Sequence, residues 1–394
     1  MKYRSTMWSL RAWLAGTLAA CVPVLALGAL PELPEPTGNV VLPEKPAHAH
    51  WAWIGDYQSG DYGRSILYNT DTGELLGIID TGWEGNGLHV SRSGGAIYTP
   101  GTFMSRGYRG ERTDVVTTYD PHTLNALREV VVPAKNAHGL PSENISTLTD
   151  DDRFLMMQFM TPASSVGVVD VKDNKFVGEI ETSGCAFVMA AGNRRFFTLC
   201  GDGSALAVSL TEDGKEASRK RYPNLFDADK DPLHGAGVRS GNTWYFVSHR
   251  GQVHTVDVAE PELKFQPVWA VAETAGELTW VPGPAFQPVA IHNAKQKLYV
   301  LMHPSDLKPK GGGYDFQDDP GIEAWVFDLK TRHRLQRIPL KNPSFAIAVS
   351  QDESPLLYAT ATFNFVVTTY DEGTGKSLLD ISIPTFPTNI HPVN

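Results

Sequence analysis

The chain of 394 residues is 42% hydrophobic and 20% charged, which suits an ordinary globular protein. Its formal net charge is −10, and Lys and Arg form no extended basic cluster. An acidic chain without such a cluster argues against binding to nucleic acids or to anionic membranes.

Residues 1–29 have the pattern of a secretory signal peptide. Their three basic residues are Lys2, Arg4 and Arg11. An apolar segment, 12–27, follows and ends at the small residues Gly28 and Ala29. This stretch is too short and too weakly flanked for a membrane span, so we predict export and cleavage near Gly28 or Ala29. The mature chain would then carry 44 acidic and 31 basic residues.

A second interpretation of the leader is lipid attachment. The segment Leu18–Cys21 resembles a bacterial lipoprotein cleavage box. The residues after Cys21 stay apolar, whereas a lipid-anchored chain usually turns polar there. We therefore favour the signal peptide and keep the lipoprotein as the alternative.

Residues 30–50 form a proline-rich stretch. The prolines are Pro31, Pro34, Pro36, Pro43 and Pro46. So many prolines leave no helical or strand period, and we predict an extended N-terminal arm. The His48-Ala49-His50 sequence in this arm is interpreted as exposed polar sequence in preference to a pair of metal ligands.

From residue 51 to residue 394 one short pattern recurs seven times: a strand, a polar turn and a second strand. Its clearest copy is 118–132, where Asp120 and Pro121 make the turn. The markers of the seven copies are Asn69, Asp120, Asp170, Ser209, Asp257, Asp328 and Asp371. A repeat of about 45–50 residues built only of short strands is typical of a β-propeller. We predict an all-β, seven-bladed β-propeller over residues 51–394.

A propeller must close its ring to remove exposed strand edges. We expect Trp51–Ile54 to pair with the C-terminal blade near Ile381–Ile383. The longest interval between markers, from Asp257 to Asp328, is attributed to an insertion at Ser305–Gln317 that is rich in Lys and Gly.

The stretch Gly101–Asp114 interrupts the strand pattern with three arginines and two aromatic residues. We predict a loop that projects from one face of the propeller, where rigid blades would hold it for binding. The alternative is a solvated loop in which Glu111 and Asp114 pair with the arginines.

Three cysteines are present, and Cys21 lies in the leader. In an exported chain the other two, Cys185 and Cys200, are expected to form one disulfide in a hairpin of a single blade. The alternative is a pair of unpaired buried thiols. A disulfide closing a loop of this size stabilises by roughly 3 kcal/mol on the chain-entropy model.

No zinc-protease helix, P-loop, nucleophile elbow or dinucleotide fingerprint occurs. The acidic triplet Asp150–Asp152 is interpreted as a solvated turn, since Arg153 follows it, and we predict no metal site. Without a self-sufficient catalytic constellation, the chain is expected to be a rigid binding scaffold or one half of an enzyme.

Several stretches, taken together, resemble the heavy subunit of the tryptophan tryptophylquinone amine dehydrogenases. They are Arg109–Asp114 with Tyr119–Pro121, Thr161–Asp170, Cys185 with Cys200–Gly203, Trp280–Gly283, Tyr299–Pro304 and Ser350–Glu353. Three segments are more similar to the aromatic (aralkyl) amine branch than to the methylamine branch: Cys200–Gly203, Met302–Pro304 and His391–Val393.

The resemblance implies a seven-bladed propeller that carries neither the cofactor nor a catalytic residue. It implies a separate, disulfide-rich light chain that holds tryptophan tryptophylquinone, in an α2β2 heterotetramer in the periplasm. That assembly would oxidise primary, here aromatic, amines to aldehyde and ammonia. It would pass electrons to a blue copper protein such as azurin or amicyanin.

By position, Phe103 and Met104 resemble the family loop at the mouth of the substrate channel. With Arg106 and Arg109 they are the predicted contacts to the light chain and the channel. Met104 stands where the methylamine branch has Phe, and Pro284 stands where relatives have a second Gly. The alternatives are an exported, non-enzymatic propeller that binds a partner and a self-contained enzyme with a cofactor in its central channel.

Overall fold

The structure is a computed structural model that describes residues 41–57, 61–85, 87–139, 142–272, 277, 279–283, 286–305 and 319–393. The chain divides into two units, Met1–Asn39 and Val40–Asn394, and the propeller belongs to the second. The predicted signal peptide, the first part of the arm, Pro284 and nearly all of the Ser305–Gln317 insertion lie outside the described residues.

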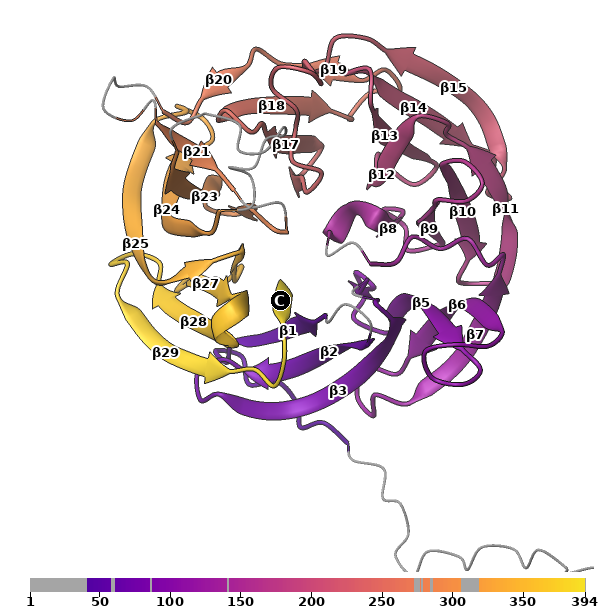
Figure 1. Cartoon of the computed structure of the whole chain (residues 1–394), viewed down its shortest axis with the longest axis horizontal. Helices are drawn as coiled ribbons and strands as arrows, with labels where there is room; N and C mark the ends of the chain where they lie inside the picture. Colours follow the sequence, from indigo (N-terminus) through magenta and orange to yellow (C-terminus); the bar gives the residue numbers. More distant parts are fainter. Residues whose placement is uncertain are drawn as a thin grey trace, which may run out of the picture. The chain divides into compact units, whose positions relative to one another are not determined.

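Seven antiparallel sheets, the blades, form a ring (Figure 1). Their strands are given from the innermost outward. Blade 1 contains β30 (Pro387–Val393), β1 (Trp51–Asp56), β2 (Tyr62–Asn69) and β3 (Glu74–Trp83). Blade 2 contains β4 (His89–Val90), β5 (Ile97–Met104), β6 (Arg112–Tyr119) and β7 (Ala126–Val132). Blade 3 contains β8 (Ser146–Leu148), β9 (Phe154–Phe159), β10 (Ser165–Asp170) and β11 (Lys175–Glu181).

Blade 4 contains β12 (Cys185–Ala190), β13 (Arg195–Cys200), β14 (Ala205–Leu210) and β15 (Glu216–Tyr222). Blade 5 contains β16 (Val238–Ser240), β17 (Thr243–Val247), β18 (Gln252–Asp257), β19 (Lys264–Phe265) and β20 (Trp269–Ala270). Blade 6 contains β21 (Trp280–Pro282), β22 (Val289–His292), β23 (Lys297–Pro304), β24 (Gly321–Asp328) and β25 (Arg334–Ser344). Blade 7 contains β26 (Ala346–Val349), β27 (Leu356–Ala361), β28 (Val366–Asp371) and β29 (Ser377–Ser382). Short 3₁₀ turns are η1 (Glu143–Ile145) and η3 (Thr362–Asn364). The seven-bladed propeller is confirmed.

The core is distributed between the blades. The described residues form seven buried hydrophobic clusters, and each one joins two neighbouring blades around the full circle. Strands inside a blade are covered on both faces by the next blades, so β9 is buried along its whole length. Outermost strands border solvent, and β15 is almost wholly exposed. Burial therefore accounts for the apolar inner strands and the charged outer ones.

The seven recurring turns connect the third strand of each blade to the strand outside it. In the copy at Asp120, the carboxylate Oδ1 accepts hydrogen bonds from the backbone N–H groups of His122 and Thr123, both at 2.8 Å. Asp371 accepts one from the N–H of Thr374 at 2.7 Å. A short acceptor side chain satisfies turn donors that have no strand partner, which is why Asp recurs there.

The ring closes by pairing β1 with β30. Trp51 lies opposite Val393 and Ile54 opposite Ile390, so the C-terminal strand becomes the innermost strand of blade 1. The predicted pairing with Ile381–Ile383 is wrong, because that segment belongs to the outer strand β29 and its end. Prolines inside β30 hid the strand; Pro387 and Pro392 fit because β30 is an edge strand facing the central channel.

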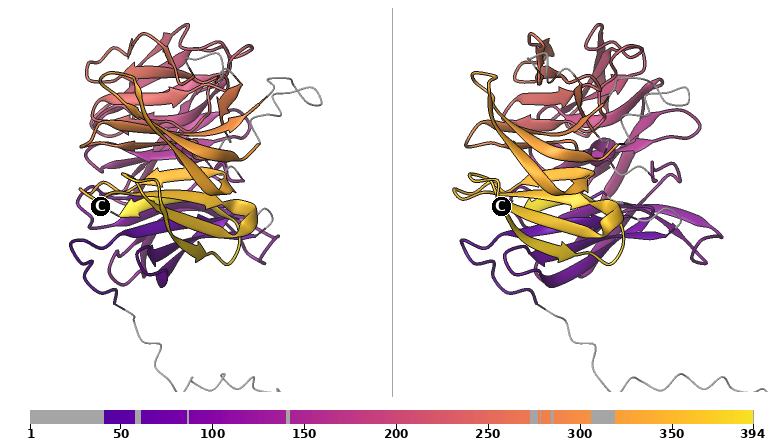
Figure 2. Two further views of the ribbon diagram at one scale, coloured as in Figure 1. Left: turned by 90° about the vertical axis from the view of Figure 1, so that its left-hand side faces the viewer. Right: turned by 60° about the vertical axis from the view of Figure 1, so that its left-hand side comes forward.

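Antiparallel order gives the ring two distinct faces, seen edge-on in Figure 2. Turns between the first and second and between the third and fourth strands lie on one face, which we call the Asp-turn face. Turns between the second and third strands, and the connections between blades, lie on the other. We call this one the hairpin face, because it includes the β5–β6 turn.

Residues 41–50, the last part of the predicted arm, lie on the propeller. Leu42 packs on the core cluster between blades 1 and 2. The His50 imidazole contacts the carboxylates of Asp71 and Asp352, at 2.7 and 3.3 Å. These two residues belong to blades 1 and 7, so His50 fastens the arm across the closure of the ring.

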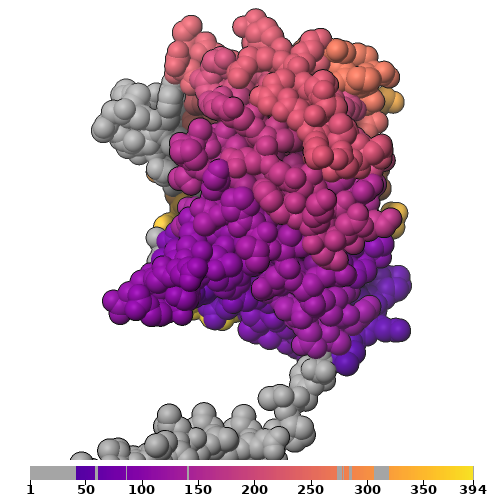
Figure 3. Space-filling view, turned by 90° about the vertical axis from the view of Figure 1, so that its right-hand side faces the viewer, coloured from indigo at the N-terminus to yellow at the C-terminus, as the bar shows by residue number. Residues whose placement is uncertain are grey.

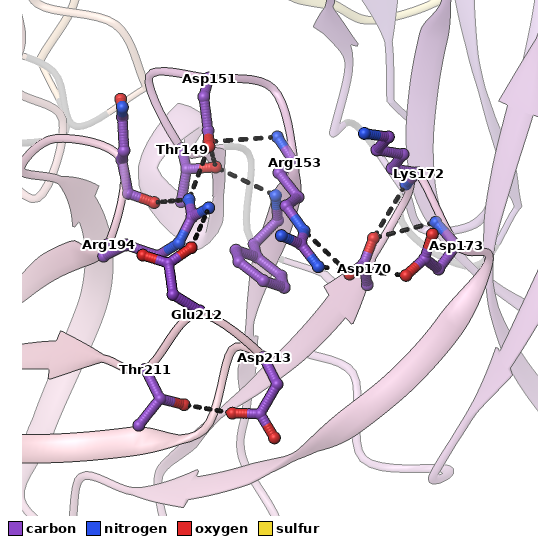
Figure 4. A network of polar contacts seen from close by, with 12 residues as sticks. Thr149, Asp151, Arg153, Asp170, Lys172, Asp173, Arg194, Thr211, Glu212 and Asp213 are labelled. Carbon is purple, nitrogen blue, oxygen red and sulfur yellow. Dashed lines mark hydrogen bonds and ion pairs between the residues drawn. The ribbon is translucent and has the colours of Figure 1, made fainter.

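The acidic triplet forms the turn between β8 and β9, and it is more than a solvated turn. Asp150 binds Arg92 of blade 2 and Arg239 of blade 5, each at 2.7 Å. Asp151 binds Arg194 of blade 4 at 2.6 Å, within the network of polar contacts in Figure 4. The arginines lie in different blades, so the triplet links parts of the ring that are distant in sequence.

Cys185 and Cys200 lie opposite each other on β12 and β13 and form the predicted disulfide. Replacing both by serine is expected to lower the free energy of unfolding by about 3 kcal/mol, because the unfolded chain regains loop entropy. Denaturant unfolding measures the change. Equal stability of the double variant and the oxidised wild type would contradict a stabilising role.

Ile390→Ala tests the closure strand. The side chain is 1% exposed in the cluster joining blades 7 and 1, so its truncation is expected to lower the free energy of unfolding by about 2–5 kcal/mol. Val131→Ala is the control, since Val131 is 66% exposed on an outer strand. Similar unfolding midpoints for the two variants would show that β30 does not hold the ring closed.

Candidate docking site around the β5–β6 hairpin

The predicted loop Gly101–Asp114 is largely an extended hairpin. β5 and β6 remain paired as far as Met104 opposite Arg112, so only residues 105–111 form the turn. Phe103 and Met104 are therefore strand residues, which corrects the prediction of a long loop. In Figure 3 the purple hairpin projects beyond the neighbouring blades. Gly107 and Gly110 have positive φ, at 69° and 108°, and allow the chain to reverse there.

A buried ion pair anchors the base of the hairpin. The Arg112 guanidinium donates to both carboxylate oxygens of Asp114, at 2.8 and 2.7 Å. Asp114 is fully buried, and its carboxylate also accepts the backbone N–H of Asn136 at 2.7 Å. The alternative in which Asp114 pairs with an arginine is thus correct for Arg112, although the pair lies inside the fold. Two-pronged pairing of this kind fixes the direction in which the hairpin leaves the ring.

Four aromatic side chains surround the turn, and we call them the hairpin aromatic cluster. They are Tyr62, Trp83, Phe103 and Tyr108. The Trp83 and Tyr108 rings meet edge to face with centroids 5.1 Å apart, and the Tyr62 hydroxyl donates to the carbonyl of Gly107 at 2.9 Å. Tyr108 is 62% exposed. Aromatic side chains that are fixed in position and partly exposed are characteristic of protein interfaces.

The four predicted site residues lie on this one hairpin. Phe103 and Met104 are half-buried at its base, and Arg106 and Arg109 are exposed at its turn. Within the described part of the chain, neither of those two guanidinium groups makes a hydrogen bond or an ion pair. The turn thus presents two guanidinium groups beside an aromatic surface, together with the exposed Glu111.

Sequence reasoning missed Tyr62 and Trp83, which come from blade 1. Each lies at the end of a strand on the hairpin face, next to blade 2. Their meeting with Phe103 depends on how the two blades pack, and no local sequence pattern encodes it.

A second aromatic group lies on the same face in blade 7, and we call it the phenylalanine cluster. It consists of Phe345, Phe363, Phe365 and Phe386. Phe363, in η3, is 64% exposed, and its ring centroid lies 5.0 Å from that of Phe345. The carbonyl of Phe386 accepts the backbone N–H of Tyr57 in blade 1 at 3.0 Å. Exposed aromatic rings therefore occur on blades 7 and 2 of this face, on either side of blade 1.

Three buried histidines also lie toward the hairpin face: His234, His249 and His303. The rings of His234 and His249 have centroids 4.4 Å apart. Burial lowers the pKa of His249 to about 4 and the pKa of His234 well below its usual value, so both rings are neutral. Across the described ranges, no group of three or more His, Cys, Asp or Glu residues is arranged to hold a metal ion.

The described residues include no helix of the length and apolarity needed to cross a membrane.

Comparison with solved structures supports the architecture. A protein of unknown function from Desulfotomaculum acetoxidans superposes with a TM-score of 0.60 at 12% identity, covering 88% of this chain and 99% of that one. A putative 6-phosphogluconolactonase from Bacteroides fragilis gives a TM-score of 0.58 at 12% identity, covering 89% and 100%. At such low identity these likenesses show the fold alone.

Comparison with protein sequences is more specific. The chain is 27% identical over 348 residues to a methylamine dehydrogenase heavy chain of Methylorubrum extorquens, covering 87% of this chain and 82% of the relative. It is 29% identical over 322 residues to that of Methylophilus methylotrophus, covering 80% and 77%. The family model for the methylamine dehydrogenase heavy chain matches residues 63–385. The chain therefore belongs to the methylamine dehydrogenase heavy chain family and is an amine dehydrogenase heavy subunit.

Proposed function

We propose that this chain is the heavy subunit of a periplasmic amine dehydrogenase that oxidises primary aromatic amines to aldehyde and ammonia. The oxidation is assigned to tryptophan tryptophylquinone on a separate light chain, which accepts the electrons of the amine. A blue copper protein such as azurin or amicyanin then receives them. This chain contributes the scaffold and part of the substrate channel within an α2β2 heterotetramer.

The observation that carries the proposal is the hairpin face. Its hairpin aromatic cluster is exposed at Tyr108, while the exposed Arg106 and Arg109 have no partner in the described part of the chain. Aromatic residues and arginine are enriched in interfaces, because they bury large areas and donate several hydrogen bonds. A light chain that covers the aromatic rings and offers acceptors to the arginines would satisfy both.

The preference for aromatic amines rests on the base of the hairpin and on the segments that resemble the aromatic branch. Phe103 and Met104 are consecutive residues of β5, so their side chains point to opposite faces of the hairpin, and the Phe103 ring contacts that of Tyr62 with centroids 6.2 Å apart. Methionine is flexible and fills irregular space. Met104 in place of phenylalanine would leave room for a substrate ring on its own side of the hairpin.

Export to the periplasm is supported by the leader and by the disulfide. Residues 1–29 have the signal-peptide pattern, and Cys185 and Cys200 are joined. Structural disulfides persist in oxidising compartments such as the periplasm and are rare in the cytosol.

Purification from the periplasm of the source organism tests the assignment. The separated subunits are stained by quinone redox cycling, and the assembly is then assayed with a panel of amines. A stained small subunit that copurifies with this unstained chain is expected, with aromatic amines oxidised fastest. A lone chain without a stained partner would overturn the assignment and favour a non-enzymatic binding module; lipid on Cys21 would identify a lipoprotein.

Arg109→Ala and Arg112→Ala separate docking from folding. Arg109→Ala is expected to weaken light-chain binding about tenfold while changing the free energy of unfolding by less than about 0.5 kcal/mol, as for an exposed site. Arg112→Ala leaves Asp114 buried and unpaired and is expected to lower that free energy by about 3–5 kcal/mol. Titration with light chain and denaturant unfolding measure the two effects. If the Arg109→Ala variant bound the light chain as tightly as the wild type does, Arg109 would not be part of the interface.

Met104→Phe tests the channel. The larger rigid ring is expected to lower kcat/KM for phenylethylamine about tenfold relative to methylamine in the assembled enzyme, because a misfit of a single methylene in a pocket already costs about 1–3 kcal/mol. Met160→Phe is the matched control, an exposed methionine on the hairpin face in blade 3. An unchanged ratio in Met104→Phe would place this residue outside the channel.

A further inference from the structure

Two adjoining cavities of about 260 and 280 Å³ are lined by residues of the innermost strands. Four residues line both cavities: Glu143, Val238, Ile291 and His391. They come from η1, β16, β22 and β30, so the cavities belong to the central channel of the propeller.

The channel holds a carboxyl group without a compensating cation. Burial raises the pKa of Glu143 to about 7. Within the described residues, its one ion-pair contact is His391, whose Nδ1 lies 3.6 Å from Oε1. Burial lowers the pKa of His391 to about 4, so this imidazole is neutral at pH 7 and does not balance the carboxylate. Arg239 also lines the channel, but its guanidinium is bound to Asp150 at 2.7 and 2.9 Å.

A second acceptor adjoins the carboxylate. His391 Nε2 is buried and has no hydrogen-bond partner within the described structure. A neutral imidazole has one donor and one acceptor nitrogen. Nδ1 faces Glu143, and with the proton on Nδ1 the other ring nitrogen, Nε2, is a hydrogen-bond acceptor. No donor among the described residues reaches it. Leaving such a group unpaired costs about 1–3 kcal/mol.

The remaining walls combine apolar side chains with polar ones, such as Ser146 in the larger cavity and Gln287 in the smaller. Val238 and Ile291 line both cavities, and Leu88 and Trp244 line the larger one. A ligand that pairs with both acceptors needs N–H donors, a positive charge complements the ionised form of Glu143, and a small apolar part fits against Val238 and Ile291.

We propose that the central channel binds a small primary ammonium cation. Its N–H groups donate to the Glu143 carboxylate and to His391 Nε2, and its alkyl part lies against Val238 and Ile291. The proposal concerns this chain alone and does not depend on the docking of a light chain to the hairpin face.

Two isomeric cations test it by isothermal titration calorimetry on the purified full chain at pH 7.5. n-Butylammonium and tetramethylammonium have the same formula and charge, but only the first has N–H donors. We expect n-butylammonium to bind with one site per chain and tetramethylammonium to bind at least tenfold more weakly. No binding of n-butylammonium, or equal affinity for the two ions, would overturn the proposal.

Variants locate the site. Glu143→Gln is expected to weaken n-butylammonium binding at least tenfold, and His391→Phe to weaken it several-fold. Glu212→Gln removes an exposed carboxylate from the Asp-turn face and is expected to leave the affinity unchanged. Wild-type affinity in Glu143→Gln would place the cation elsewhere and overturn the assignment. Should Glu143→Gln not fold, the comparison of the two isomers on the wild type still decides the outcome.

Discussion

Everything in this molecule depends on the pairing of β30 with β1, because a propeller without closure exposes two strand edges and the faces of two blades. β30 follows all the other strands in sequence, so the ring closes only when strands from the two ends of the propeller meet in blade 1. The buried clusters between blades then continue around the circle without interruption. His50 and the triplet at positions 150–152 add polar links across blades. Side chains on separate blades are thereby held in fixed positions relative to one another.

The rigid ring holds the β5–β6 hairpin in one position on the hairpin face. The β5–β6 hairpin is short, and a two-stranded ribbon alone is marginally stable in water. Here its base is fixed by Arg112 and Asp114 inside the fold, and its turn rests on Tyr62 of the adjacent blade. The chain thus presents Tyr108 and two arginines that have no partner among the described residues, without ordering a loop at the moment of binding. Preorganisation of this kind lowers the entropic cost of association.

The sequence predicted features that depend on residues close together in the chain, and it missed contacts between blades. The seven turns were recognisable because an Asp such as Asp120 satisfies nearby backbone donors, and the disulfide followed from export and cysteine spacing. The closure strand was misplaced because Pro387 and Pro392 disguise an edge strand. The hairpin was read as a loop because glycines and arginines interrupt its apolar pattern. Two contacts join different blades: Trp83 with Tyr108, and Asp150 with Arg239. The local sequence around these residues contains no pattern that predicts them.

Hydrogen–deuterium exchange of this chain with and without its purified light chain tests the central claim most directly, since it maps the contact on both faces at once. The account predicts slower exchange in residues 103–111 of the hairpin turn upon assembly. It also predicts unchanged exchange in the turns that follow Asp120 and Asp371 on the Asp-turn face. Protection confined to the Asp-turn face, or none on either face, would contradict it.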